Sequence, residues 1–100
     1  MKKKKTTKLK SYLKTKLKDD EFKVAYEEVK IHLKIANLLE ELRHKAGLTQ
    51  ADLAKKTGVS QPMIARLERG DQDRVPTLHT INKIFRSLGY EVDLVVKRVA

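Results

Sequence analysis

The 100-residue sequence contains no cysteine, and proline, glycine and aromatic residues are scarce. Without cysteine the chain can form neither a disulfide nor a thiolate metal site, and it has no thiol nucleophile. The three histidines, His32, His44 and His79, lack the spacing of a metal site, and no glycine-rich phosphate loop occurs. We therefore expect a protein that is not an enzyme and that needs neither a metal nor a cofactor.

Long apolar runs are also missing from the sequence. No stretch approaches the roughly 18 apolar residues that a membrane-spanning helix requires. The basic N-terminus is not followed by the apolar segment of a secretory signal. These absences predict a soluble, cytoplasmic protein.

Acidic residues are absent from the first 18 positions, although the whole chain contains 13 of them. The same 18 positions hold nine of the 23 lysines and arginines, so the net charge of +10 comes almost entirely from this segment. A block of like charge is typical of a flexible, solvated arm. An arm that contacts DNA phosphates is the alternative.

Helical periodicity begins at Asp19, a residue suited to an N-cap. Two apolar sets follow at spacings of three and four, and they are displaced from each other by one residue: first Phe22, Tyr26, Val29, Leu33 and Ala36, then Ile35, Leu38, Leu39, Leu42 and Ala46. This displacement predicts a break or bend near residues 30–32, with a leader helix over residues 19–32. Gly47 is expected to end the second helix in a left-handed conformation.

Three shorter helices and one strand are predicted after Gly47. Thr49 and Ser60 are suited to N-cap two of the helices, and Pro76-Thr77 opens the third. The chain then ends with alternating apolar residues that are typical of a strand: Tyr90, Val92, Leu94 and Val96. The sequence thus predicts an all-α fold of four to six helices over residues 19–89, followed by a β-strand in residues 90–100.

Residues 50–69, QADLAKKTGVSQPMIARLER, have the pattern of two short helices joined by a tight turn. Ala54 is small where the two helices cross, and Gly58 supplies the positive φ that the turn requires. Ile64 and Leu67 can press the second helix onto the first. This is the pattern of a helix-turn-helix, whose second helix enters the major groove of DNA.

The sequence from about residue 35 to residue 88 resembles the Xre family, the Cro/C1-type, lambda-repressor-like helix-turn-helix domains. The segments that carry the resemblance are LRHKAGLTQADLAKKTGVSQPMIARLERG and VPTLHTINKIFRSLG. The resemblance implies a DNA-binding domain over residues 33–89 that recognises a double-stranded operator. The residues that it implicates in DNA binding are Arg43, Gln50, Ser60, Gln61, Pro62, Met63, Arg66 and Arg69.

Chemistry suggests different roles for these side chains. Gln61 can pair with adenine and Arg66 with guanine, while Gln50 and Arg69 suit phosphates. Pro62 and Met63 cannot donate a hydrogen bond, so they either meet thymine methyl groups or fill space. Arg43 and Glu68 hold positions that form a buried pair in phage repressors of this family, and for Arg43 a phosphate contact stays open alongside that role.

The predicted terminal strand has no evident partner within the chain. Its residues Tyr90, Val92, Leu94 and Val96 are expected to pair with a second copy and form a homodimer, because an unpaired strand leaves its backbone polar groups unsatisfied. Strand addition to a partner protein and packing against its own domain are the alternatives.

The segment TKLKDDEFKVAYEEVK, residues 15–30, resembles the leader of HigA-type antitoxins, although Asp20 stands where relatives often have proline. The resemblance implies an antitoxin that neutralises a RelE/HigB-like, mRNA-cleaving toxin and represses its own operon. The residues expected to contact the toxin are Asp19, Asp20, Phe22, Tyr26 and Val29. The alternative is a stand-alone Xre-family regulator in which the leader helix packs on the core.

Overall fold

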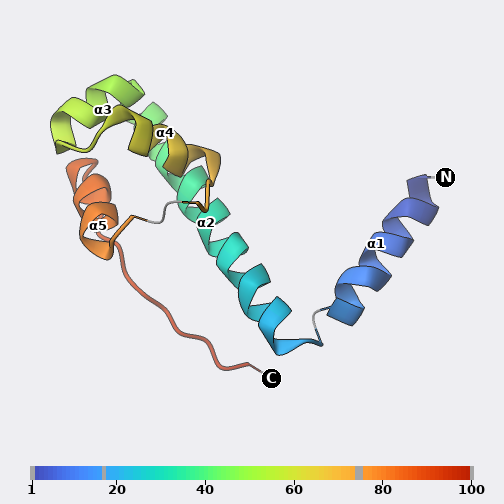
Figure 1. Cartoon of the computed structure of the whole chain (residues 1–100). Coiled ribbons are helices and arrows are strands. Elements are labelled where there is room, and N and C mark those ends of the chain that lie inside the picture. The colour runs from blue at the N-terminus through green and yellow to red at the C-terminus, as the bar shows by residue number, and fades with distance from the viewer. Residues whose placement is uncertain (1, 17, 74–75, 100) are drawn as a thin grey trace. The chain divides into compact units, whose positions relative to one another are not determined.

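The computed structural model describes residues 2–16, 18–73 and 76–99, so small parts of the predicted arm, of the loop before Pro76 and of the C-terminal segment lie outside it. The described residues form five helices (Figure 1): α1 (Lys2–Lys16), α2 (Asp20–Lys45), α3 (Gln50–Thr57), α4 (Gln61–Arg69) and α5 (Leu78–Ser87). They divide into two compact units, Met1–Ile31 and His32–Ala100. The all-α prediction is confirmed.

The first unit contains α1 and the beginning of α2. Residues 2–16, expected to be a flexible arm, are helical instead. The segment has no glycine or proline, and lysine and leucine are good helix formers, so local propensity favours this helix. Asp19 then caps α2 as predicted, because its Oδ1 accepts hydrogen bonds from the backbone N–H groups of Glu21 and Phe22, at 2.9 and 3.3 Å.

Helix α2 is continuous over 26 residues and has no break near residues 30–32, which corrects the prediction of a separate leader helix. No glycine or proline interrupts the segment, so the backbone has no local reason to leave the helix. Ala36 and Leu39 are buried, whereas Val24 and Ile31 are more than half exposed. The two displaced apolar sets therefore lie on one uninterrupted helix, and each supplies one buried residue: Ala36 from the first set and Leu39 from the second.

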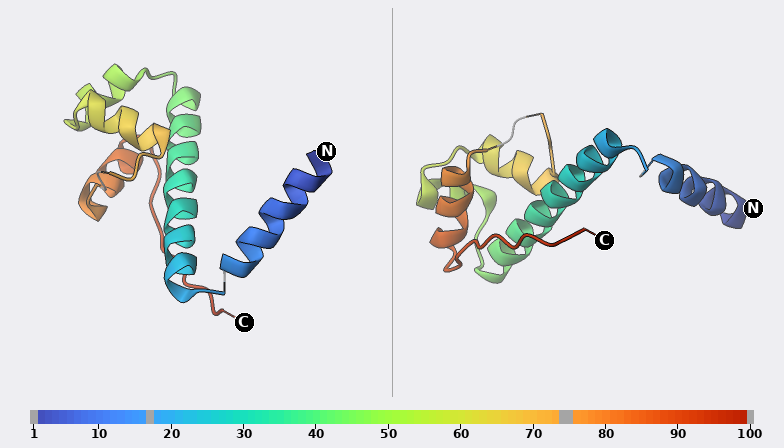
Figure 2. Two further views of the ribbon diagram at one scale, coloured as in Figure 1. Left: turned by 45° about the vertical axis from the view of Figure 1, so that its right-hand side comes forward. Right: turned by 90° about the horizontal axis from the view of Figure 1, so that it is seen from below.

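The second unit has a core to which every helix from α2 to α5 contributes. Its fully buried residues are Leu39, Leu53, Ile64 and Ile84, one from each helix. Burying such a side chain completely contributes roughly 1.5–3 kcal/mol. Figure 2 shows α3, α4 and α5 on one side of the C-terminal part of α2, an arrangement that fixes α4 relative to α3.

The C-terminal segment after α5 forms no strand in the described chain, which corrects the prediction for residues 90–97. A strand needs a partner for its backbone groups, and residues 2–16, 18–73 and 76–99 contain no other strand. Leu94 and Val96 are 85% and 86% exposed, so the apolar residues of this segment are uncovered in a single chain. None of the described helices is both long and apolar enough to cross a membrane.

Candidate nucleic-acid interface

Helix α3 is fixed at both ends by local hydrogen bonds. At its start, Thr49 Oγ1 accepts from Asp52 N at 3.0 Å, and Asp52 Oδ2 accepts from Thr49 N at 2.9 Å. This capping box lowers the pKa of Asp52, first through the Thr49 backbone N–H and then through the Thr49 side chain. Gly58 ends the helix with φ of 75°, as predicted. The sequence pattern identified Thr49 as the cap but left out Asp52, which the Thr-x-x-Asp spacing could have indicated.

Helix α4 begins and ends as the helix-turn-helix pattern predicts. Ser60 accepts from Met63 N at 3.3 Å, Pro62 lies in the first turn, and Gly70 follows the last turn with φ of 70°. Ile64 and Leu67 are buried on one side of the helix. The opposite side is therefore free to meet a ligand.

The predicted DNA-contacting residues of α4 differ in exposure. Gln61, Pro62 and Arg69 are exposed, Arg66 is partly exposed, and Met63 is partly buried against the core cluster. For Met63 this placement favours filling space over meeting a thymine methyl group. Arg69 lies on the surface with its Nη2 3.9 Å from Asp71 Oδ2, an exposed pair that contributes little to stability.

Arg43 and Glu68 form the buried ion pair that the sequence predicts. Arg43 Nε and Nη2 donate to Glu68 Oε2 and Oε1, at 2.6 and 2.8 Å, and the two side chains are only 8% and 6% exposed. Arg43 Nη1 donates to the carbonyl of Leu48 at 2.7 Å, and Nη2 also lies 3.3 Å from His44 Nε2. With every guanidinium nitrogen engaged, the geometry of Arg43 favours bracing the domain over contacting a phosphate.

The pair stays charged despite its burial. Burial by itself raises the pKa of Glu68, but hydrogen bonds from Arg43 and then Gln50 outweigh it, so this pKa lies below its usual value. The hydrogen bond to Glu68 raises the pKa of Arg43. At neutral pH the negative charge of Glu68 is therefore neutralised by the positive charge of Arg43 directly beside it.

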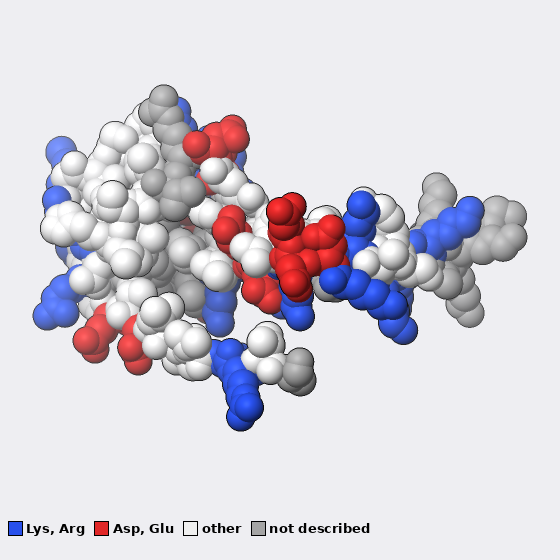
Figure 3. Space-filling model, turned by 60° about the horizontal axis from the view of Figure 1, so that its bottom comes forward, with Lys and Arg blue, Asp and Glu red and all other residues white. Residues whose placement is uncertain are grey.

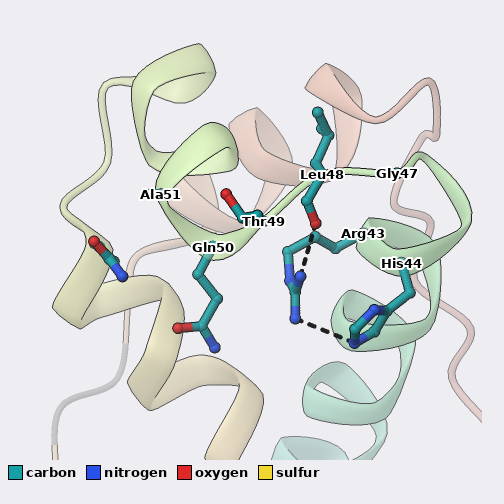
Figure 4. Close-up of a pocket in the computed structure, with 8 residues that line it drawn as sticks. Arg43, His44, Gly47, Leu48, Thr49, Gln50 and Ala51 are labelled. Carbon is teal, nitrogen blue, oxygen red and sulfur yellow. Dashed lines mark hydrogen bonds between the residues drawn. The ribbon is translucent and has the colours of Figure 1, made fainter.

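Gln50, the first residue of α3, lies at an open groove of about 520 Å³. The groove is lined by the end of α2, the turn after it, the start of α3 and Gln61 of α4. Figure 4 shows Gln50 in this groove and the hydrogen bonds that join Arg43 to Leu48 and to His44. The first backbone N–H groups of a helix have no intrahelical acceptor. Together with the Gln50 amide they give this groove hydrogen-bond donors suited to a phosphate.

The predicted toxin-contacting residues lie in the first unit. Phe22 and Tyr26 stack with ring centroids 6.4 Å apart, and Lys30 Nζ lies 5.9 Å from the centre of the Tyr26 ring. Asp19 and Asp20 are exposed, and Val29 is partly buried. On the face drawn in Figure 3, acidic side chains gather over the first turns of α2.

The described residues include no group of three or more His, Cys, Asp or Glu that could hold a metal ion.

Comparisons with known proteins also identify a helix-turn-helix in this chain. Residues 39–95 match the helix-turn-helix family HTH_3. The chain is 39% identical over 71 residues to an uncharacterized HTH-type transcriptional regulator of Haemophilus influenzae, covering 68% of this chain and 69% of that protein. It is 31% identical over 71 residues to the antitoxin HipB of Escherichia coli, covering 71% of this chain and 78% of HipB.

A solved structure shares the fold. The crystal structure of an HTH_3 family transcriptional regulator from Vibrio cholerae is similar with a TM-score of 0.57 and 39% sequence identity. The similarity covers 62% of this chain but only 34% of the Vibrio chain. The shared part is therefore one portion of a longer protein in that case.

Proposed function

Because the chain belongs to the HTH_3 helix-turn-helix family, we propose that it is a transcriptional regulator that binds a specific double-stranded operator. The observation that carries this proposal is that α4 has one buried side and one exposed side. Ile64 and Leu67 anchor one side in the core, whereas Gln61 and Arg69 are exposed. A recognition helix needs both properties, because it must be held rigidly while it presents side chains to the major groove.

The proposed DNA-binding part comprises residues 33–89, and its side chains divide by chemistry. Gln61 reads adenine and Arg66 reads guanine in the major groove. Gln50 and Arg69 bind phosphates and set the register of the domain on the duplex. Gln61 is the first residue of α4, Arg66 and Arg69 lie in its last turn, and Gln50 is the first residue of α3.

We further propose that the protein binds its operator as a homodimer and represses its own promoter. The homodimer is supported by the exposed apolar surface of residues 90–99, which a second copy can cover by strand pairing. A two-fold dimer presents two recognition helices to two half-sites.

Selection from a random duplex library with the full chain tests the operator proposal. We expect enrichment of one sequence motif, and we expect the double variant Gln61→Ala/Arg66→Ala to lose the preference for it. Lys34→Ala is the control for lost positive charge, because Lys34 lies exposed on α2. The absence of any enriched motif would exclude sequence-specific binding.

A second proposed function is that of an antitoxin that neutralises a RelE/HigB-like toxin. The supporting observations are the exposed acids at the start of α2, the stacked Phe22 and Tyr26, and the similarity to HipB. A toxin that cuts RNA must present positive charge to phosphates, which acidic side chains can meet. Stacked aromatic residues are common anchors in protein interfaces.

Co-expression with the product of the adjacent gene, scored for growth rescue, tests the antitoxin proposal. We expect Phe22→Ala/Tyr26→Ala to lose the rescue while operator binding is kept. Val24→Ala is the matched control, because Val24 is an exposed apolar residue on the opposite side of the same helix. Growth arrest that the unaltered chain does not relieve would leave the stand-alone regulator as the better description.

A further inference from the structure

Glu68, in the last turn of α4, is a buried carboxylate that accepts hydrogen bonds from side chains of two other helices. Its Oε1 accepts from Arg43 Nη2 at 2.8 Å and from Gln50 Nε2 at 3.2 Å, while its Oε2 accepts from Arg43 Nε at 2.6 Å. Arg43 lies in the last turn of α2, and Gln50 is the first residue of α3. One carboxylate therefore joins the end of α2, the start of α3 and the end of α4.

We propose that Glu68 is a positioning residue that holds the amide of Gln50 ready for a DNA phosphate. This inference rests on the proposed DNA-binding function. A primary amide has two N–H donors, and Glu68 occupies one of them. The other donor is left for a ligand in the groove that Gln50 lines.

The gain from this contact is pre-organisation. A free glutamine side chain has several rotatable bonds, and ordering them upon DNA binding weakens the affinity. In this chain the bond to Glu68 has already restricted the Gln50 side chain before DNA arrives. The phosphate contact of Gln50 should thus depend on a residue that does not itself touch DNA.

Arg43 makes such a carboxylate compatible with DNA. An unpaired negative charge near the phosphate backbone would repel it. The two short hydrogen bonds from Arg43 neutralise Glu68 locally, and the pair is almost completely buried. Glu68 can therefore orient Gln50 without exposing its charge to the phosphates.

A double-mutant cycle on DNA affinity tests the inference, with the full chain and a duplex enriched from a random library. Gln50→Ala in the unaltered chain should weaken binding by about tenfold, the loss expected for one hydrogen bond to a charged group. In an Arg43→Met/Glu68→Met background, the same change should weaken binding by less than about twofold. An equal loss in both backgrounds, or no loss in the unaltered chain, would overturn the inference.

The choice of background avoids a simple folding defect. Replacing both members of a buried pair by apolar residues is often neutral, whereas removing one leaves an uncompensated charge. Thermal unfolding checks the fold of each variant, and Arg43→Leu/Glu68→Leu, which also removes both charges and the acceptor for Gln50, replaces the methionine pair in the cycle if that pair does not fold. These controls separate lost positioning from lost structure.

NMR of the chain without DNA separates this inference from the proposed function. The Gln50 side-chain amide should exchange its hydrogen-bonded proton slowly with solvent, and this protection should disappear in Arg43→Met/Glu68→Met. Fast exchange in the unaltered chain would overturn the inference even if DNA binding were found. Slow exchange in a chain that selects no duplex motif would overturn the proposed function and, with it, the role of Glu68 in DNA binding.

Discussion

Gly70, the residue after α4, lies directly against Leu33 of α2. A Cβ atom added at Gly70 would come within 3.0 Å of Leu33 Cδ2 and 3.9 Å of the Ala36 Cβ. Gly70 also has φ of 70°, a conformation that disfavours other L-residues. A residue without a side chain therefore suits this position at the end of α4 in two ways, by its positive φ and by the close approach of Leu33.

We expect Gly70→Ala to lower the free energy of unfolding by more than the roughly 1–2 kcal/mol that positive φ alone costs an L-residue. The added contact with Leu33 accounts for the excess. Gly47→Ala is the matched control, because Gly47 has φ of 71° but nothing within 4 Å of its added Cβ. Chemical denaturation of both variants measures the difference, and equal losses would show that Leu33 simply moves aside.

The Arg43–Glu68 pair predicts a pH dependence of stability with a definite sign. The pKa of Glu68 is lower in the folded chain than its ordinary value, which is about 4.3 in an unfolded chain. The contribution of the pair is therefore complete above that ordinary value and is lost as the pH falls through the lower folded value. Unfolding free energies measured between neutral pH and about pH 3 should fall along this course.

The control for this pH dependence is the Arg43→Met/Glu68→Met double variant. It should show a shallower fall, because it lacks the buried carboxylate that takes up a proton. Asp52→Asn removes the other lowered pKa of the described residues and corrects for its separate contribution. A fall of the same steepness in the methionine variant would assign the acid sensitivity to other carboxylates.

Local rules predicted the helix-turn-helix well. Thr49 and Ser60 cap their helices and Gly58 has a positive φ, because each depends on the chemistry of a few neighbouring residues. The pairing of Arg43 with Glu68 could be predicted only from the family resemblance, because 25 positions separate the two residues. The link from Glu68 to Gln50 was missed, since no local pattern brings those residues together.

The errors have two physical origins: local helix propensity was underrated in the first two helices, and the C-terminal segment lacks a pairing partner among the described residues. A shift in the apolar pattern suggested a break in α2, but the helix continues because no residue interrupts it. The Lys-rich segment was expected to lack regular structure from charge alone, although its residues favour a helix. The alternating residues after Gly89 were assigned to a strand, yet a strand depends on a partner that the described residues do not contain.

Arg66→Ala should change operator preference at one base pair. Removing the guanine contact should cost roughly 1–3 kcal/mol on the selected motif and much less on a duplex with that base pair replaced. Arg69→Ala is the comparison, since removing a phosphate contact weakens binding to all sequences about equally. Binding isotherms on matched duplexes decide the matter: a uniform loss in Arg66→Ala would reassign this arginine to the phosphates.

The exposed lysines of α1 should raise the salt dependence of DNA binding if this helix contacts phosphates. Changing Lys8, Lys10, Lys14 and Lys16 together to glutamine should lower the slope of log K against log salt by about 0.9 for each phosphate that the variant no longer neutralises. The same four changes to arginine keep the charge and should keep the slope. An unchanged slope in the glutamine variant would mean that α1 stays in solvent when the domain binds DNA.

Removing residues 91–100 should weaken dimerisation and operator binding together. The truncation removes most of the apolar residues that a second copy is proposed to cover, among them Val92, Leu94 and Val96. Because each half-site then has to be bound by a separate chain, the affinity for the full operator should approach that for a half-site. Analytical ultracentrifugation measures the monomer–dimer equilibrium. The full-length variant Val92→Thr/Leu94→Thr/Val96→Thr has β-branched residues at all three positions but loses apolar surface. A monomer–dimer midpoint unchanged by the truncation would place the dimer contact elsewhere in the chain.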